Sequence, residues 1–260
     1  MSIEPGNYDI VDLSIPLRFN GPQPNAFGVE PATAKACAYG DLVGDTRRGG
    51  SCNFEQITLI PHCNGTHTEC VGHITHERIS VRHCLTDVMV SAKLITIEPQ
   101  PAIESGESYA VSFGDKDLII TRRSLEQALS SNKFDALVVR TLPNEDSKLT
   151  RVYTDSTTPY FTTDAMEFIV SLGVQHLLVD LPSIDRMSDE GKLSNHRIFW
   201  NVDQGSVKVK ADTRMNSTIT ELIYVPNNAE DGNYMLNLQI APFESDAAPS
   251  RPVLFKMKNS

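Results

Sequence analysis

Alternating polar and apolar positions predict several β-strands along the chain. Residues 8–15 alternate in this way, and Pro16 closes the segment. Residues 136–140 and 176–180 are continuous apolar runs, which are typical of strands covered on both faces. Further segments with a strand-like pattern are residues 54–60, 92–97, 206–210 and 234–240.

Two helices are predicted between these strands. The first has Ser124 as its cap, and the second begins at Thr163 and stops at Gly173. A strand follows directly, so we expect a strand–helix–strand unit and a mixed α/β fold. Residues 22–50 are rich in proline and glycine and predict a long loop region. With no internal repeat or linker to divide the chain, residues 1–260 are expected to form a single domain.

Composition and charge limit the classes of partner. The chain has 260 residues, of which 40% are hydrophobic, and a formal net charge of −10. That charge argues against nucleic acid or an anionic membrane as a partner, because both bind clustered lysine and arginine, and it leaves a small-molecule substrate open. The N-terminus, residues 1–5, lacks the basic and then apolar pattern of an export signal, so a cytoplasmic protein is expected.

Residues 61–73 (PHCNGTHTECVGH) concentrate side chains that bind metal ions. Three histidines, two cysteines and a glutamate fall within these thirteen residues, and imidazole, thiolate and carboxylate are ligands of cations such as zinc. In an extended segment Cys63, His67, Glu69 and His73 share one face, and His62 points away. A turn at residues 64–65 would break this parity, so His62 stays an alternative ligand. The competing interpretation is a loop of ordinary polar residues.

A metal site needs further support from elsewhere in the chain. Asp180 to Asp185 follow the end of a buried strand, where open α/β sheets place their sites, His196 lies on a short loop, and Glu221 is a charge within an apolar run. The alternatives are a turn former, a surface loop residue and a solvent-facing strand residue. Five cysteines without disulfide-like spacing predict free thiols or metal ligands, with Cys63 the strongest candidate ligand.

Taken together, these residues resemble a family of metal-dependent cyclases and kynurenine formamidase-like hydrolases that includes isatin hydrolases. The family signature His-x-Gly-Thr-His-x-Asp-x-Pro-x-His is similar to residues 63–73, CNGTHTECVGH. Asp180, Ser183 and Asp185 match an Asp-x-x-Ser-x-Asp turn of the family, and residues 12–17 and 242–253 resemble its first and closing strands. The resemblance covers most of the chain.

This resemblance implies a swivelling β/β/α fold with mixed sheets and flanking helices, a homodimer or homotetramer, and one or two zinc or manganese ions per chain. The metal ligands that it implies are Cys63, His67, Glu69, His196 and Glu221. His73 takes the acid–base role, and Asp180, Ser183 and Asp185 form the supporting turn.

Three positions depart from the family pattern. Cys63 replaces a histidine, Glu69 is one methylene longer than the expected aspartate, and Val71 replaces a proline. A thiolate favours zinc over manganese and makes bound water less acidic. The longer glutamate puts bridging to a second ion in question, and His62 is the candidate substitute for the first histidine.

We therefore expect a metal-dependent hydrolase of a small amide, lactam or ester, with an aryl formamide as the model substrate. One alternative is a non-catalytic family member that keeps the fold and a structural ion, which four protein ligands would close. Another alternative makes Cys63 a nucleophile with His67 or His73 as its base. Counting protein ligands and alkylating Cys63 would separate these interpretations.

Overall fold

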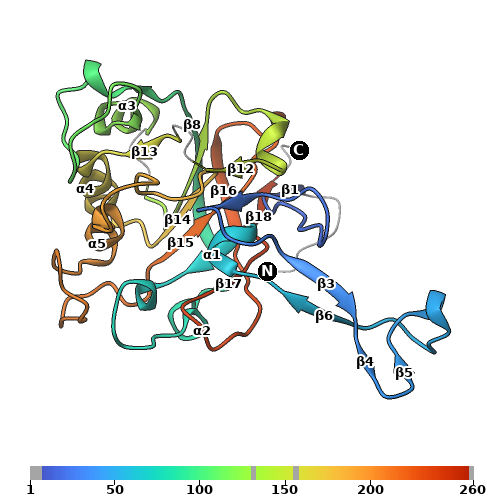
Figure 1. The fold of residues 1–260 in the computed structure, drawn as a ribbon. Coiled ribbons are helices and arrows are strands. Elements are labelled where there is room, and N and C mark those ends of the chain that lie inside the picture. Colours follow the sequence, from blue (N-terminus) through green and yellow to red (C-terminus); the bar gives the residue numbers. More distant parts are fainter. Residues whose placement is uncertain (1–7, 130–132, 155–157, 258–260) are drawn as a thin grey trace.

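A nine-stranded mixed sheet runs through the centre of the computed structural model, which describes residues 8–129, 133–154 and 158–257 (Figure 1). The strand order is β1-β18-β16-β8-β11-β14-β15-β7-β17. In chain order these strands are β1 (Tyr8–Asp12), β7 (His67–Glu69), β8 (Val90–Ile97), β11 (Ala136–Thr141), β14 (His176–Val179), β15 (Thr218–Glu221), β16 (Gly232–Asn237), β17 (Ala247–Pro249) and β18 (Val253–Met257).

The four central strands, β8, β11, β14 and β15, are parallel, and the flanking strands pair antiparallel. All residues of β11, β14 and β15 are buried. The continuous apolar runs at residues 136–140 and 176–180 thus form strands covered on both faces, and the predicted mixed α/β class is confirmed.

Helices α3, α4 and α5 lie together on one side of the sheet (Figure 1). The helices are α1 (Pro61–Asn64), α2 (Val81–Cys84), α3 (Arg122–Ala128), α4 (Thr163–Ser171) and α5 (Ser194–Trp200), and 3-10 turns span Thr46–Arg48, Val71–His73, Ala102–Glu104 and Asp146–Leu149. The helix predicted from residue 163 is α4. The cap assigned to Ser124 is wrong, because α3 begins one turn earlier, where the Thr121 side chain accepts a hydrogen bond from the Ser124 N–H.

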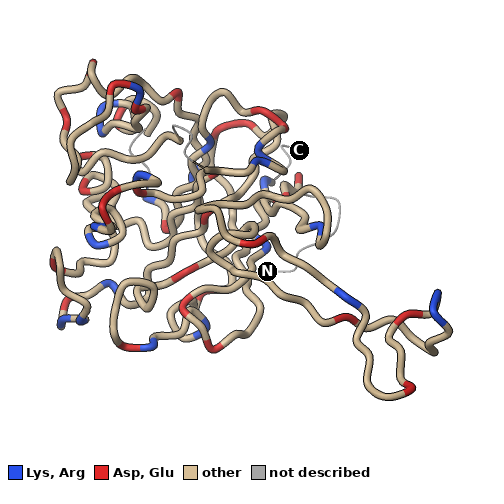
Figure 2. Tube along the Cα trace, in the orientation of Figure 1, with Lys and Arg blue, Asp and Glu red and all other residues tan. Residues whose placement is uncertain are grey.

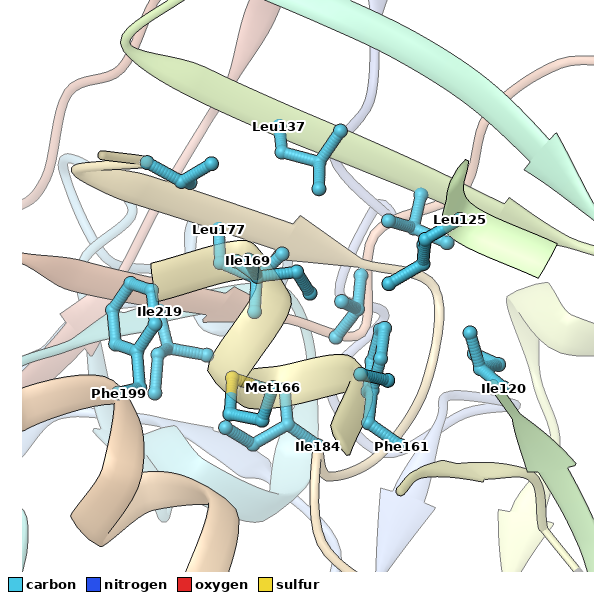
Figure 3. Packing of buried hydrophobic residues seen from close by; sticks show 14 of the residues in the cluster. Ile120, Leu125, Leu137, Phe161, Met166, Ile169, Leu177, Ile184, Phe199 and Ile219 are labelled. Carbon is cyan, nitrogen blue, oxygen red and sulfur yellow. The ribbon is translucent and has the colours of Figure 1, made fainter. Parts of the chain in front are cut away.

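The main core fills the space between these helices and the sheet. Met166 and Ile169 of α4 and Phe199 of α5 pack toward Leu177 and Ile219 of the strands (Figure 3). A second cluster covers the opposite face of the sheet and includes residues of β8, β11, β16 and β18. Packing on both faces fixes the central strands and therefore the strand ends at which the candidate site lies.

A β-rich projection, residues 33–58, replaces much of the predicted loop region; we call it the arm. It extends away from the body of the molecule (Figure 1), and Thr33 pairs with Thr58 at its base. The strand predicted at residues 54–60 belongs to the arm and is exposed along its length. The short strands are β2 (Asn25–Ala26), β3 (Thr33–Ala36), β4 (Ala38–Tyr39), β5 (Leu42–Val43), β6 (Glu55–Thr58), β9 (Gln100–Pro101), β10 (Leu118–Ile120), β12 (Val152–Tyr153) and β13 (Tyr160–Phe161).

One predicted strand does not form. Residues 206–210 alternate like a half-exposed strand but form an irregular loop with one bend at Lys208, and no strand of the described chain pairs with them. Alternation alone cannot supply a neighbour whose backbone groups complete a ladder. No helix in the described ranges has the length and apolar character needed to cross a bilayer.

Candidate metal centre

Strand β7 places two of the predicted ligands in the interior. It lies between β15 and β17, and His67 is directly opposite Glu221 of β15. Alternate residues of a strand share a face, so His67, Glu69 and Glu221 project to the same side. His67 Nε2 lies 3.5 Å from Glu221 Oε2, and the side chains of His67 and Glu69 are at most 1% exposed.

Helix α5 brings His196 to the same point. Its Nε2 atom lies 3.0 Å from Glu69 Oε1 and 3.7 Å from Glu221 Oε1. The other ring nitrogen, Nδ1, lies 2.7 Å from Asp185 Oδ2, and Asp185 also accepts the backbone N–H groups of Asn195 and His196. Asp185 therefore fixes both the ring of His196 and the start of α5, as expected of a carboxylate that orients a metal-binding histidine.

His62 also reaches Glu69, because residues 61–64 are not extended. Pro61 occupies the first turn of α1, and the Asn64 side chain accepts the Ile60 N–H at 2.6 Å. The chain then turns into β7 at Gly65, whose φ of 157° favours glycine. The parity argument that turned His62 away is therefore wrong: His62 Nδ1 lies 2.8 Å from Glu69 Oε2.

Asp246 is a fourth carboxylate at the site, and sequence reasoning missed it. Its Oδ2 atom lies 2.8 Å from His62 Nε2 and 3.5 Å from His73 Nδ1. The rings of His62 and His73 are 4.2 Å apart, and His73 Nε2 lies 4.0 Å from Glu69 Oε2. Asp246 lies within the segment that resembles the family's closing strand, but no motif distinguished it from other surface acids.

Opposite charges tune the titration of the cluster. Burial opposes a charge on His62, but the carboxylates of Asp246 and Glu69 outweigh burial and raise its pKa to about 10. Burial likewise opposes a charge on His196, yet Asp185 and Glu69 raise its pKa well above the ordinary range. Burial would raise the pKa of Glu69, but the surrounding imidazoles hold that pKa well below its ordinary value.

The donor atoms fit a metal ion. Two groups have their ligand atoms within 4.8 Å of one another: His62, Glu69 and His73 form one, and His67, Glu69 and Glu221 form the other. Glu69 Oε2 lies 2.8 Å from His62 Nδ1, and His67 Nε2 lies 3.5 Å from Glu221 Oε2, so each of these buried atoms faces another potential ligand of the same ion. Imidazole nitrogen and carboxylate oxygen are the atoms that zinc accepts. Because metal ligation requires neutral imidazole, an ion that binds here displaces protons.

The remaining predicted residues lie close by but make other contacts. Cys63 is buried, and burial together with the charge of Glu221 raises its pKa to about 11. It belongs to neither ligand group among the described residues. Ser183 accepts the Asp185 N–H at 3.1 Å, which shapes the turn. Asp180 accepts hydrogen bonds from the side chains of Lys148 and Thr141, each at 2.8 Å.

A buried cluster of imidazoles and carboxylates beside the central strands of a mixed sheet defines an α/β protein with a candidate metal centre. The model of the cyclase family matches residues 11–186, which is more than half of the chain. The chain belongs to the cyclase family. The turn that contains Asp180, Ser183 and Asp185 lies within the matched region, whereas His196, Glu221 and Asp246 lie beyond it.

One relative by sequence and several solved structures similar to this chain are named hydrolases. The chain is 21% identical to a kynurenine formamidase of Bacillus cytotoxicus over 80% of this chain and 82% of that protein. An isatin hydrolase structure with bound thioisatinate, a product analogue, superposes with a TM-score of 0.63 at 14% identity, over 97% and 94% of the two chains. The structure of a predicted metal-dependent hydrolase from Bacillus stearothermophilus gives a TM-score of 0.61 at 15% identity, over 95% of this chain and 98% of that chain. At these identities the structures show a shared fold, and the named relatives support a hydrolase of the cyclase family.

Proposed function

We propose that this protein is a metal-dependent hydrolase that cleaves a C–N or C–O bond in a small amide, lactam or ester. An aryl formamide is the model substrate. The observation that carries the proposal is the clustering of ligand atoms around the buried Glu69, which belongs both to the group of His62, Glu69 and His73 and to the group of His67, Glu69 and Glu221. The names of the relatives agree with it.

His67, Glu69, His196 and Glu221 are the proposed interior ligands, and His62 takes the place of the family's first histidine. A zinc or manganese ion held here supplies the Lewis acidity that makes water a nucleophile near neutral pH and polarises a carbonyl. The group of His67, Glu69 and Glu221 would hold one ion, and a second ion would occupy the group of His62, Glu69 and His73. The acid–base role proposed for His73 applies to the state with one ion, in which His73 is not a ligand.

His73 is the proposed general acid–base residue. Its Nδ1 atom faces Asp246, which favours the tautomer with the proton on Nδ1 and leaves Nε2 directed toward the Glu69 side. In this role Nε2 takes the proton of the attacking water and returns it to the leaving nitrogen or oxygen. At 27% exposure, the His73 side chain is reachable by a substrate, whereas Glu69 at 1% is not.

Metal content and turnover of the untagged protein test this proposal. We expect about one or two zinc or manganese ions per chain by elemental analysis, and hydrolysis of formanilide that a chelator abolishes and added metal restores. Protein without metal, or with a tightly bound ion and no turnover on amides, lactams or esters, would instead indicate the non-catalytic alternative.

We also propose that the protein is a homodimer or homotetramer in which the arm contacts a second copy. Tyr39, Leu42 and Ile57 of the arm are 85%, 50% and 50% exposed. Isolated two-stranded ribbons are marginally stable in water, so the arm needs a covering surface. Light scattering should give at least twice the mass of one chain, and replacing residues 37–54 by an Asn-Gly turn should lower it to one. A wild-type mass of one chain contradicts this.

A further inference from the structure

The metal centre is open to solvent on one side. The side chains of His67, Glu69, His196 and Glu221 are between 0% and 5% exposed. By contrast, those of His62, His73 and Asp246 are 23%, 27% and 34% exposed. A substrate that reaches the centre therefore has to pass His62, His73 and Asp246. The chemistry of this exposed side decides which molecules enter.

A cavity of about 310 Å³ adjoins this open side. The lining residues are Gly72, His73, Thr75, His76, Arg78, Ile79, Glu244, Ser245 and Asp246. Ligand cavities of proteins span roughly 300–1,000 Å³, so this one suits a small molecule rather than a polymer. The same His73 ring faces both the cavity and the buried Glu69, which places a ligand of the cavity beside the proposed acid–base group.

Arg78 lines the cavity and has no ion-pair partner among the described residues. Among the described residues, Glu244 is paired with Arg82 at 2.8 Å, and Asp246 is paired with His62 and His73. The Arg78 guanidinium is exposed and makes no hydrogen bond or ion pair with any other described residue. Lysines and arginines are otherwise scattered among acidic residues over the trace (Figure 2).

The acidic surroundings make this free guanidinium significant. Two carboxylates, Glu244 and Asp246, line the cavity itself, so a negatively charged ligand there needs a compensating cation. A guanidinium offers a planar fork of donors that matches a carboxylate, which an ammonium does not. Since Arg78 is exposed and solvent screens the interaction, we expect a contribution to specificity rather than an absolute requirement.

We infer that this cavity binds the anionic end of the substrate, with Arg78 pairing with a carboxylate while the scissile carbonyl lies beside His73. The inference rests on the proposed hydrolase function and narrows it to small amides or esters that carry a carboxylate. It also distinguishes two functions within residues 73–78, since His73 moves the proton and Arg78 selects the substrate.

A matched pair of probes tests the inference on the metal-loaded protein. The probes are 4-formamidobenzoate, which carries a carboxylate, and formanilide, which is neutral but has the same scissile bond. For the wild type we expect kcat/KM to be about 10-fold higher for 4-formamidobenzoate than for formanilide. Arg78→Met should bring the ratio of these two kcat/KM values close to one by raising KM for the charged probe. Arg78→Lys should give an intermediate ratio, because it keeps the charge and loses the fork.

The control is Arg123→Met, which removes an exposed guanidinium on α3, outside the residues that line the cavity, and should leave the ratio unchanged. A wild type without preference, or an Arg78→Met variant that keeps the preference, overturns the inference. If neither probe is hydrolysed, the aryl formamide is the wrong model substrate, and the hydrolase proposal is then tested with lactams and esters. The cavity is then tested by calorimetry with benzoate, whose binding Arg78→Met should weaken about 10-fold. Equal binding to both proteins, or none to the wild type, rejects the anion site.

Discussion

Glu69→Gln is expected to remove metal from both ligand groups and to lower kcat/KM by more than about 100-fold. Losing a partner that merely orients a ligand costs about 10- to 100-fold, so loss of a shared ligand should cost more. The amide keeps the size of the side chain but cannot neutralise an ion, and Glu69 is the one residue common to both groups. Elemental analysis and turnover of formanilide measure the two effects.

Glu77→Gln is the matched control, because Glu77 is an exposed residue on the same segment and belongs to neither ligand group. Circular dichroism of both variants checks that the fold is retained. If Glu69→Gln kept full metal content and full turnover, the centre assigned here would be wrong. If it kept metal at one position, the two groups would bind ions independently.

Lys148→Met is expected to lower the free energy of unfolding by about 3–5 kcal/mol, because it leaves the buried Asp180 carboxylate without its cation. The Lys148 and Asp180 side chains are 5% and 0% exposed, and Nζ lies 2.8 Å from Oδ2. Burial raises the pKa of Asp180, and the Lys148 ammonium opposes that rise. Chemical denaturation followed by circular dichroism measures the change.

Two further variants make that result specific. Lys210→Met breaks an ion pair of similar length, in which Nζ lies 2.7 Å from Asp203. Because Asp203 is 71% exposed, the free energy of unfolding should stay unchanged within error. Lys148→Met combined with Asp180→Asn removes both charges and should recover part of the loss. Metal content should stay at the wild-type value, because neither residue belongs to a ligand group. A cost for Lys148→Met no larger than that for Lys210→Met contradicts the prediction.

Part of the proximity among the candidate site residues follows from the sequence. His67 and Glu69 lie on one face because a strand alternates its side chains, and that much follows from spacing alone. His196 and Glu221 were selected from the family resemblance, and Glu221 also because it is a charge within an apolar run. Spacing alone cannot predict contact between residues that lie more than 120 positions apart. Their actual contacts depend on the pairing of β7 with β15 and on the packing of α5.

The errors come from segments in which tertiary contacts outweigh local pattern. The α1 turn has only four residues, and the hydrogen bond from the Ile60 N–H to the Asn64 side chain holds it, so alternation was a poor guide for His62. Residues 206–210 had the right alternation but no partner strand. Asp246 had no local signal, because its role depends on two rings from residues 62 and 73, more than 170 positions earlier.

The arm and the candidate site share a short piece of backbone. Only Leu59 and Ile60 separate the end of β6 from the first residue of α1, the turn that carries His62. A surface that holds the arm in place would therefore also hold the start of the turn that carries His62, because only two residues separate them. The pairing of Thr33 with Thr58 fixes the base of the arm. An insertion at the far end of the arm should therefore leave the position of His62 unchanged.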